Sequence, residues 1–205
     1  EQIAGFYDNE AAELYIMKGL PSALQRPTLA HEVFHGIQDQ HFDLNSVRGP
    51  FTGKENGDFI MARTALIEGD ATVLMLDFSM LDSTSNLPQG VSSIVDVPMV
   101  AGLIRSVSLE NFEQLEKFGG APPPDSAMAR APKSIKDSLM FPYLAGLRFV
   151  FFARAQKTWT QFDEIYKNPP VSTEQIIHPE KYFANELPTI LEFSARKALP
   201  QHTKV

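Results

Sequence analysis

The stretch LAHEVFHGIQDQHFDL, residues 29–44, decides how the rest of this chain is interpreted. It contains His31, Glu32 and His35 in the spacing H-E-x-x-H. In an α-helix, residues four positions apart lie on the same face, so both imidazoles can reach one ion. Apolar neighbours would form a flank that holds this helix against a core: Leu29, Val33, Phe34 and Ile37. We therefore predict a helix that carries two metal ligands.

The residue types in this motif suit zinc chemistry. Neutral imidazole binds Zn²⁺ well, and catalytic zinc typically has three protein ligands and a water molecule. Glu32 directly follows His31 and would lie beside the ligand face, where it can take a proton from the attacking water. The motif predicts a zinc-dependent hydrolase with Glu32 as the general base. The alternative is a chance match, with one core histidine and one surface histidine.

Two residues compete for the place of the third ligand, and His41 is one of them. It follows His35 by six residues, as in the pattern HExxHxxGxxH. That pattern needs a glycine midway, because the helix must end in a left-handed turn there. Gln38 occupies the position here and would pay a steric cost. If the helix continues instead, His41 lies on a different face from the other two histidines.

Glu68, in the segment ALIEGDAT, is the candidate that we favour. It lies within a strongly apolar segment, where an ionised carboxylate is costly unless it is paired or binds a metal. Gly69 beside it costs about 1 kcal/mol relative to alanine inside a helix. A close approach to the HExxH helix would explain that glycine. The alternative for Glu68 is a buried ion pair with Arg63 or Arg105.

The remaining sequence predicts a mostly helical α+β chain with a small N-terminal β-hairpin beside the HExxH helix. Aromatic and β-branched residues flank a polar turn in the hairpin, which we expect over residues 3–17. We expect helices near residues 27–43, 58–82, 107–118, 134–156, 159–167 and 187–198. Glycine, proline and serine mark loops at residues 49–57, 83–98 and 119–132.

Composition excludes several classes of function. The net charge of −7 argues against general binding to nucleic acid or anionic membranes, because both need a basic surface. The absence of cysteine excludes disulfides, thiolate catalysis and cysteine-ligated zinc. The most apolar stretch, residues 139–153, is too short to span a bilayer. Because the chain begins at Glu1, we expect a processed or truncated form, and we favour a secreted, periplasmic or lipid-anchored protein over a cytoplasmic one.

These motifs resemble a known group of metallopeptidases. HExxH on one helix and a glutamate in an E-G-x-A setting on the next resemble the gluzincin branch of the zincins. The segments LAHEVFHGIQDQHFDL, ALIEGDAT and PPVSTEQIIHPEKY are similar to a poorly characterised bacterial family of zincin-like proteins. The resemblance implies one zincin-like domain over residues 1–205, a Zn²⁺ ion held by His31, His35 and Glu68, and a peptide or protein substrate.

The resemblance also bears on the surroundings of the metal. In zincins a sheet edge runs along the cleft and pairs with an extended substrate, which gives the N-terminal hairpin a role; an ordinary core hairpin is the alternative. Gluzincins often carry an aspartate four residues after the ligand glutamate, where this chain has Thr72. Asp70, Asp39 or Gln38 could orient an imidazole instead.

An acid or oxyanion donor from outside the motif helps to stabilise the tetrahedral intermediate. We choose His178, which follows a short apolar stretch and precedes Pro179, a setting typical of a helix end or loop that can face a cleft. Tyr182 and Tyr143 are rivals, and a structural role for His178 is the alternative.

Three hypotheses follow. The first is an active zinc metallopeptidase or related amide hydrolase. The second is a catalytically inactive zincin-fold module for binding or sensing, with a structural metal in a closed site. The third is a helical interaction domain in which the motif is accidental. The complete HExxH and the downstream glutamate favour the first.

Overall fold

The computed structural model describes residues 4–49, 56–84, 91–106 and 127–189. It is mostly helical with a two-stranded antiparallel sheet, as an α+β chain should be. The elements in chain order are β1 Gly5–Asp8, β2 Glu13–Ile16, α1 Ser22–Phe42, α2 Leu44–Arg48, α3 Gly57–Thr84, the 3-10 helix η1 Ile94–Asp96, α4 Pro98–Ser106, α6 Ala127–Arg130, α7 Lys133–Arg154, α8 Trp159–Lys167, α9 Thr173–Ile177 and α10 Pro179–Phe183. In the described ranges, no helix is long and apolar enough to cross a membrane.

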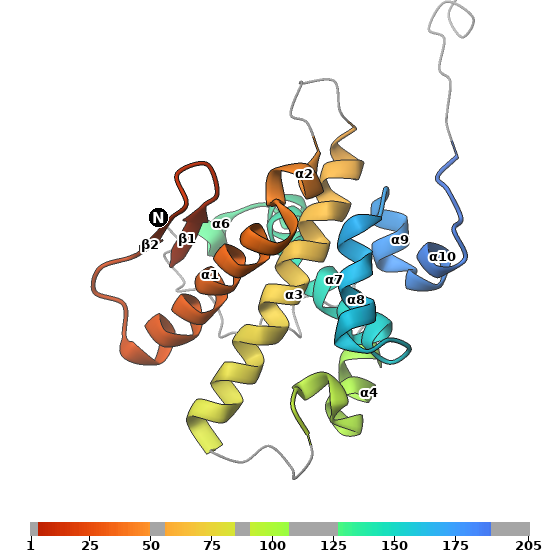
Figure 1. Ribbon diagram of the computed structural model, residues 1–205. Coiled ribbons are helices and arrows are strands. Elements are labelled where there is room, and N and C mark those ends of the chain that lie inside the picture. The colour runs from red at the N-terminus through yellow and green to blue at the C-terminus, as the bar shows by residue number, and fades with distance from the viewer. Residues whose placement is uncertain (1–3, 50–55, 85–90, 107–126, 190–205) are drawn as a thin grey trace, which may run out of the picture.

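Helix α3 runs through the middle of the molecule (Figure 1). It packs against α1 on one side and against α7 on another. Its middle turns are buried, and most of their residues are apolar. The core residues that it contributes are Ala62, Ala65, Leu66, Ile67, Ala71 and Val73.

Gly69 marks the closest approach of α3 to a neighbouring helix, and that neighbour is α7. A Cβ atom on Gly69 would lie 2.2 Å from the carbonyl carbon of Gly146. A Cβ atom on Gly146 would lie 1.9 Å from the carbonyl oxygen of Ala65. The expectation that Gly69 allows contact with the HExxH helix is therefore wrong. Gly69 instead allows the close contact of α3 with α7.

Helix α1 begins earlier than predicted. It starts at Ser22, so Pro27 lies inside the helix rather than in its first turn. Proline lacks an N–H group, and this removes a single hydrogen bond to the carbonyl four residues back. That position is close to the helix N-terminus, where the loss does not end the helix. Near its other end, α1 reaches Phe42, and Asp43 adopts a left-handed conformation with a φ of 53°.

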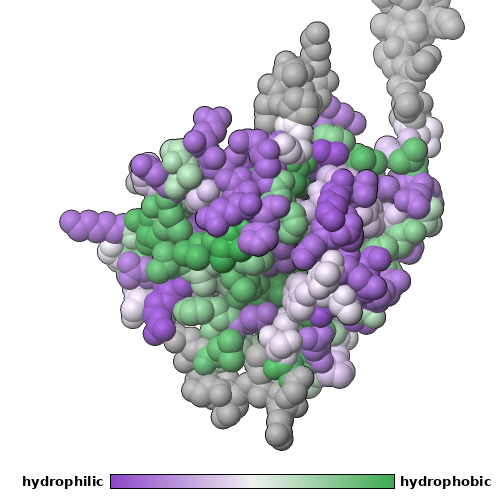
Figure 2. All heavy atoms as spheres, in the orientation of Figure 1, coloured by the Kyte–Doolittle hydropathy of each residue, from purple (hydrophilic) through white to green (hydrophobic). Residues whose placement is uncertain are grey.

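Helix α1 buries polar residues and exposes apolar ones. Its buried residues are His31, Glu32, His35 and Gln38. Three apolar residues of the expected flank are more than two-fifths exposed: Leu29, Val33 and Ile37. The prediction that they hold the helix to the core is therefore wrong. The space-filling view shows apolar surface over this part of the molecule (Figure 2). The hydrogen bonds between α1 and α3 come from buried polar residues of α1.

The predicted hairpin is confirmed and lies against α1. Phe6 pairs with Tyr15, and their rings stack with centroids 4.7 Å apart. The hydroxyl of Tyr7 donates to the carboxylate of Asp39 in α1 at 3.0 Å. At the turn, the carboxylate of Asp8 accepts hydrogen bonds from two backbone N–H groups. These contacts tie β1 to the helix that carries the HExxH motif.

The later helices match the sequence in part. Helices α7 and α8 confirm the elements expected at 134–156 and 159–167, and a capping box formed by Thr158 and Gln161 starts α8. Helix α4 was not predicted. The helix expected at 107–118 lies outside the described residues, as does most of the loop at 119–132. The helix expected at 187–198 does not include residues 187–189, and its remainder also lies outside.

Candidate metal centre

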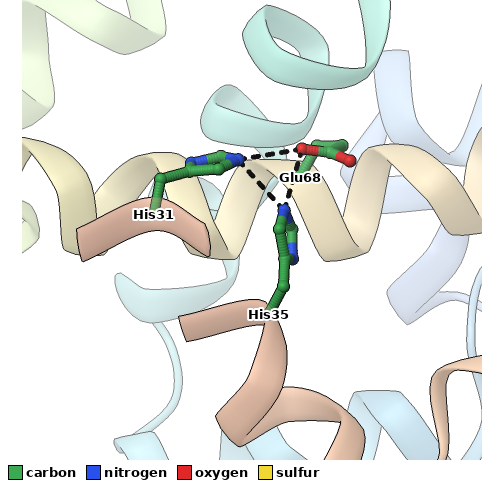
Figure 3. A group of neighbouring side chains, drawn as sticks. All are labelled: His31, His35 and Glu68. Carbon is green, nitrogen blue, oxygen red and sulfur yellow. Dashed lines mark hydrogen bonds and ion pairs between the residues drawn. The ribbon is translucent and has the colours of Figure 1, made fainter. Parts of the chain in front are cut away.

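Three side chains from two helices converge on one point (Figure 3). The Nε2 atoms of His31 and His35 are 3.0 Å apart. The Oε2 atom of Glu68 lies 3.2 Å from the first and 3.3 Å from the second. The three side chains are between 8% and 13% exposed. We call His31, His35 and Glu68 the ligand triad, and these atoms could together hold a metal ion.

Gln38 fixes the orientation of His35. Its amide nitrogen faces three hydrogen-bond acceptors: the carbonyl of Ile67 at 3.1 Å, the carboxylate of Asp70 at 3.2 Å and the hydroxyl oxygen of Tyr166 at 2.7 Å. Tyr166 donates its own proton to Asp70 at 2.7 Å. The Oε1 atom of Gln38 is therefore left to accept from Nδ1 of His35 at 2.8 Å. With the proton on Nδ1, the lone pair of neutral His35 lies on Nε2 and points into the triad.

The second histidine has no comparable support. Nδ1 of His31 is buried and has no hydrogen-bond partner in the described part of the chain. Its Nε2 atom, by contrast, faces both other members of the triad. Both imidazoles thus turn a nitrogen toward the same point as the carboxylate. This arrangement suits a cation, which two lone pairs and a negative charge would stabilise together.

The carboxylate of the triad is held in its ionised form. Burial raises the pKa of Glu68, but hydrogen bonds from His31 and His35 outweigh it and lower that pKa to about 2. Burial lowers the pKa of His35, yet its interactions with Glu68 and Gln38 outweigh burial and leave it raised. The negative charge of Glu68 therefore attracts a positive one, which either a proton or a metal ion can supply.

Glu32 lies beside the triad and is 7% exposed. Burial raises the pKa of its carboxyl, and the two histidines and the backbone N–H of Tyr7 act in the opposite direction. Burial outweighs them, and the pKa of Glu32 stays raised above its ordinary value. A carboxylate with a raised pKa is a better proton acceptor than an exposed one. The hairpin thus meets the HExxH helix next to the residue that can move a proton.

Tyr143 in α7 is the other polar residue that the structure brings to the triad. Its ring centroid lies 6.1 Å from that of His31. Burial raises the pKa of its hydroxyl, and the nearby carboxylates of Glu68 and Glu32 raise it further. The hydroxyl therefore keeps its proton and can donate a hydrogen bond. The sequence offered this tyrosine only as a rival, because nothing local distinguishes it from other tyrosines.

His178 is not brought to the triad. It joins α9 to α10, and its Nδ1 atom lies 3.4 Å from a carboxylate oxygen of Glu180. Its side chain is 53% exposed. Figure 1 places α9 and α10 on the opposite side of the molecule from α1. His178 therefore does not lie at the triad, whereas its rival Tyr143 does. Tyr182, the other rival, donates to the backbone carbonyl of Asn168.

The other residues that the sequence placed near the metal do not join the triad. His41 is exposed, and its Nδ1 atom donates to the carbonyl of Ile37, because α1 continues as a helix through Gln38. Arg63 donates to the carbonyl of Val47 and lies over the ring of Phe59. It therefore does not pair with Glu68. Thr72 donates to the backbone carbonyl of Glu68.

Two cavities lie near these residues. The smaller, about 350 Å³, has Glu68 and Tyr143 in its wall. The larger, about 470 Å³, is lined by Gln38 and Asp70 but by no member of the triad. Reactive chemistry at the triad would therefore be served by the smaller cavity. The larger one lies behind the group that orients His35.

Comparisons with protein-family models, with curated proteins and with solved structures find no match to this chain.

Proposed function

We propose that this protein is a zinc metallopeptidase of the zincin type, with His31, His35 and Glu68 as metal ligands and Glu32 as the general base. The observation that carries the proposal is the convergence of three ligand atoms from α1 and α3, with a fourth buried polar side chain, Glu32, beside them. Burying four such groups is costly unless something binds them.

The donor set suits zinc. Two imidazole nitrogens and one carboxylate oxygen are a ligand combination of catalytic zinc sites. A tetrahedral ion with bonds of about 2.0–2.2 Å separates its ligand atoms by about 3.3–3.6 Å. The triad atoms are 3.0–3.3 Å apart, so small side-chain shifts are enough. When bound, zinc supplies Lewis-acid activation of water and of the substrate carbonyl.

Three residues of the chain carry out proton transfer, oxyanion stabilisation and orientation of a ligand. Glu32 accepts a proton from the attacking water and can then pass it to the leaving amine. Tyr143 keeps its phenolic proton and can donate a hydrogen bond to the oxyanion of the tetrahedral intermediate. Gln38 keeps the proton of His35 on Nδ1, which leaves Nε2 free as a ligand.

Strand β1 supplies an edge for an extended substrate. The backbone N–H of Met17 donates to the carbonyl of Ala4, so hydrogen-bonded pairs alternate from there, and Phe6–Tyr15 is one. The backbone groups of Tyr7 consequently point away from β2, and its N–H faces Glu32. In the described part of the chain no further strand pairs with this edge, and its position beside the general base supports binding of a peptide by strand addition.

The substitution Glu32→Gln tests this proposal. It removes the proton acceptor and keeps the size of the side chain, so peptide hydrolysis should fall about 10²–10⁴-fold while zinc is retained. Glu164→Gln, at an exposed position of α8, is the matched control and should keep full activity. Undiminished hydrolysis by the Glu32→Gln protein would contradict the proposal. A wild-type protein that holds zinc but cleaves no peptide in a random library would favour the inactive module with a structural metal.

A further inference from the structure

The smaller cavity lies between α3 and α7, and Glu68 of the triad forms part of its wall. Its volume is about 350 Å³, near the lower end of the roughly 300–1,000 Å³ range of small-ligand pockets. Its wall is formed by Gly57, Ile60, Met61, Thr64 and Glu68 of α3 and by Ser138, Leu139, Pro142 and Tyr143 of α7. We call it the α3–α7 pocket.

The glycine contact explains why the pocket lies there. Gly69 and Gly146 bring the two helices together at the backbone. All residues of the pocket precede these glycines on their own helices, where larger side chains hold the helices apart. Glu68 is the last pocket residue of α3 and directly precedes the contact. The pocket therefore ends at the carboxylate that belongs to the triad.

The wall of the pocket is mainly apolar. Among the described residues that line it, Glu68 carries the one charge and there is no Lys, Arg or His. An anionic side chain would lose its hydration there and meet the carboxylate of Glu68, which is costly, and a cationic one would compete with the metal ion for that carboxylate. An apolar side chain would instead cover Leu139, which is 54% exposed, and the half-buried Met61. Removal of this apolar surface from water favours binding.

From this position and this lining, we infer that the α3–α7 pocket binds the apolar side chain of the substrate residue next to the cleaved bond. The inference rests on the proposed function, since Glu68 serves both as a metal ligand and as the pocket wall. Tyr143 links the two as well, because its ring lies beside His31 and also lines the pocket. A side chain in this pocket would thus be anchored within one residue of the reacting carbonyl.

Metal-chelating probes test the pocket without turnover. The probes are peptidyl hydroxamates that differ only in one side chain: leucyl, phenylalanyl, aspartyl, lysyl or glycyl. Calorimetric titration of the zinc-loaded protein gives the affinity of each. We expect the leucyl or phenylalanyl probe to bind at least about tenfold more tightly than the glycyl probe, and at least about 100-fold more tightly than the aspartyl probe.

A pair of matched substitutions assigns the preference to this pocket. Met61→Trp should fill it and weaken binding of the preferred apolar probe about tenfold or more, with the glycyl probe unchanged. Met99→Trp makes the same change at a position of α4 that is 81% exposed, and it should alter neither affinity. Proteolysis of peptides that carry the same five residues should follow the same order.

The outcomes separate the pocket from the proposed function. Hydroxamates that all bind with similar affinity, or a Met61→Trp protein that keeps the wild-type preference, would overturn the pocket inference and leave the metallopeptidase proposal standing. A zinc-loaded wild-type protein that binds no hydroxamate and cleaves no peptide would overturn both.

Discussion

The two long interfaces of α3 follow opposite designs. Against α7, the helix presents small and apolar residues, and the backbones touch at Gly69 and Gly146. Against α1, it presents Glu68 and Asp70, which meet buried polar residues of the HExxH helix. The first interface gains free energy from close packing. At the second interface, burying charged groups costs free energy.

The difference shows where stability and function are separated in this molecule. The side chains of Gly, Ala, Leu and Phe carry no polar groups or charges, so an interface made of them needs no bound ligand or ion. The α1 interface turns two imidazole nitrogens toward an ionised carboxylate, and these atoms could together hold a metal ion. Changes at the α7 interface should therefore affect folding, whereas changes at the α1 interface should affect metal binding and proton exchange.

The largest effect is expected for Gly146→Ala. The added methyl group would meet the carbonyl oxygen of Ala65 at 1.9 Å, and a backbone atom in the core cannot move aside as a flexible side chain can. We expect the free energy of unfolding in urea to fall by at least about 3 kcal/mol. Gly102→Ala is the control: nothing lies within 4 Å of its added atom, and the change should stabilise α4 by up to about 1 kcal/mol. A stable Gly146→Ala protein would contradict the close approach.

Asp70→Asn tests the cost of burying charge near α1. Burial raises the pKa of Asp70 to about 6 from an ordinary value of 3.8. Its ionised form is thus disfavoured in the folded chain, and the cost is absent below pH 3.8 and fully present above about pH 6. In the metal-free protein this lowers stability by up to about 3 kcal/mol as pH rises through that window.

The asparagine variant should lack this loss while still accepting a hydrogen bond from Tyr166. Urea unfolding of both metal-free proteins at pH 4 and pH 7 measures the difference. The wild-type protein should lose stability relative to the variant between the two values. A difference that does not change with pH would show that Asp70 titrates normally.

Gln38→Leu should have a smaller effect, a loss of zinc affinity. It removes the acceptor that keeps the proton of His35 on Nδ1. We expect zinc affinity to fall about 10–100-fold, measured by competition with a chelator. Gln40→Leu, at an exposed position of the same helix, should bind zinc as the wild type does. Equal zinc affinities of the two variants would show that Gln38 does not support zinc binding.

The sequence predicted what depends on local periodicity. The spacing of His31 and His35 placed both on one helix face, and the apolar surroundings of Glu68 marked it as unusual. Aromatic and β-branched residues on both sides of a polar turn predicted the hairpin over residues 3–17. Each of these signals lies within one element, so no knowledge of its neighbours was needed.

The sequence did not predict several contacts between elements that are far apart in the chain. Gly69 was correctly identified as a close-approach residue, but its partner is 77 positions further along the chain at Gly146. Tyr166 supports Gln38 across 128 positions, and no local pattern joins them. His178 has a setting suited to a cleft, yet α9 and α10 pack away from α1. The exposed Leu29, Val33 and Ile37 show that polar contacts around the triad outweighed the usual burial of apolar residues.

The metal content of the purified protein tests the central claim most directly. It should be compared among the wild type, Glu68→Ala and His41→Ala after reconstitution with zinc and removal of the excess. The account predicts about one zinc per chain in the wild type and in His41→Ala, and little or none in Glu68→Ala. Zinc retained by Glu68→Ala, or no zinc in the wild type, would contradict it.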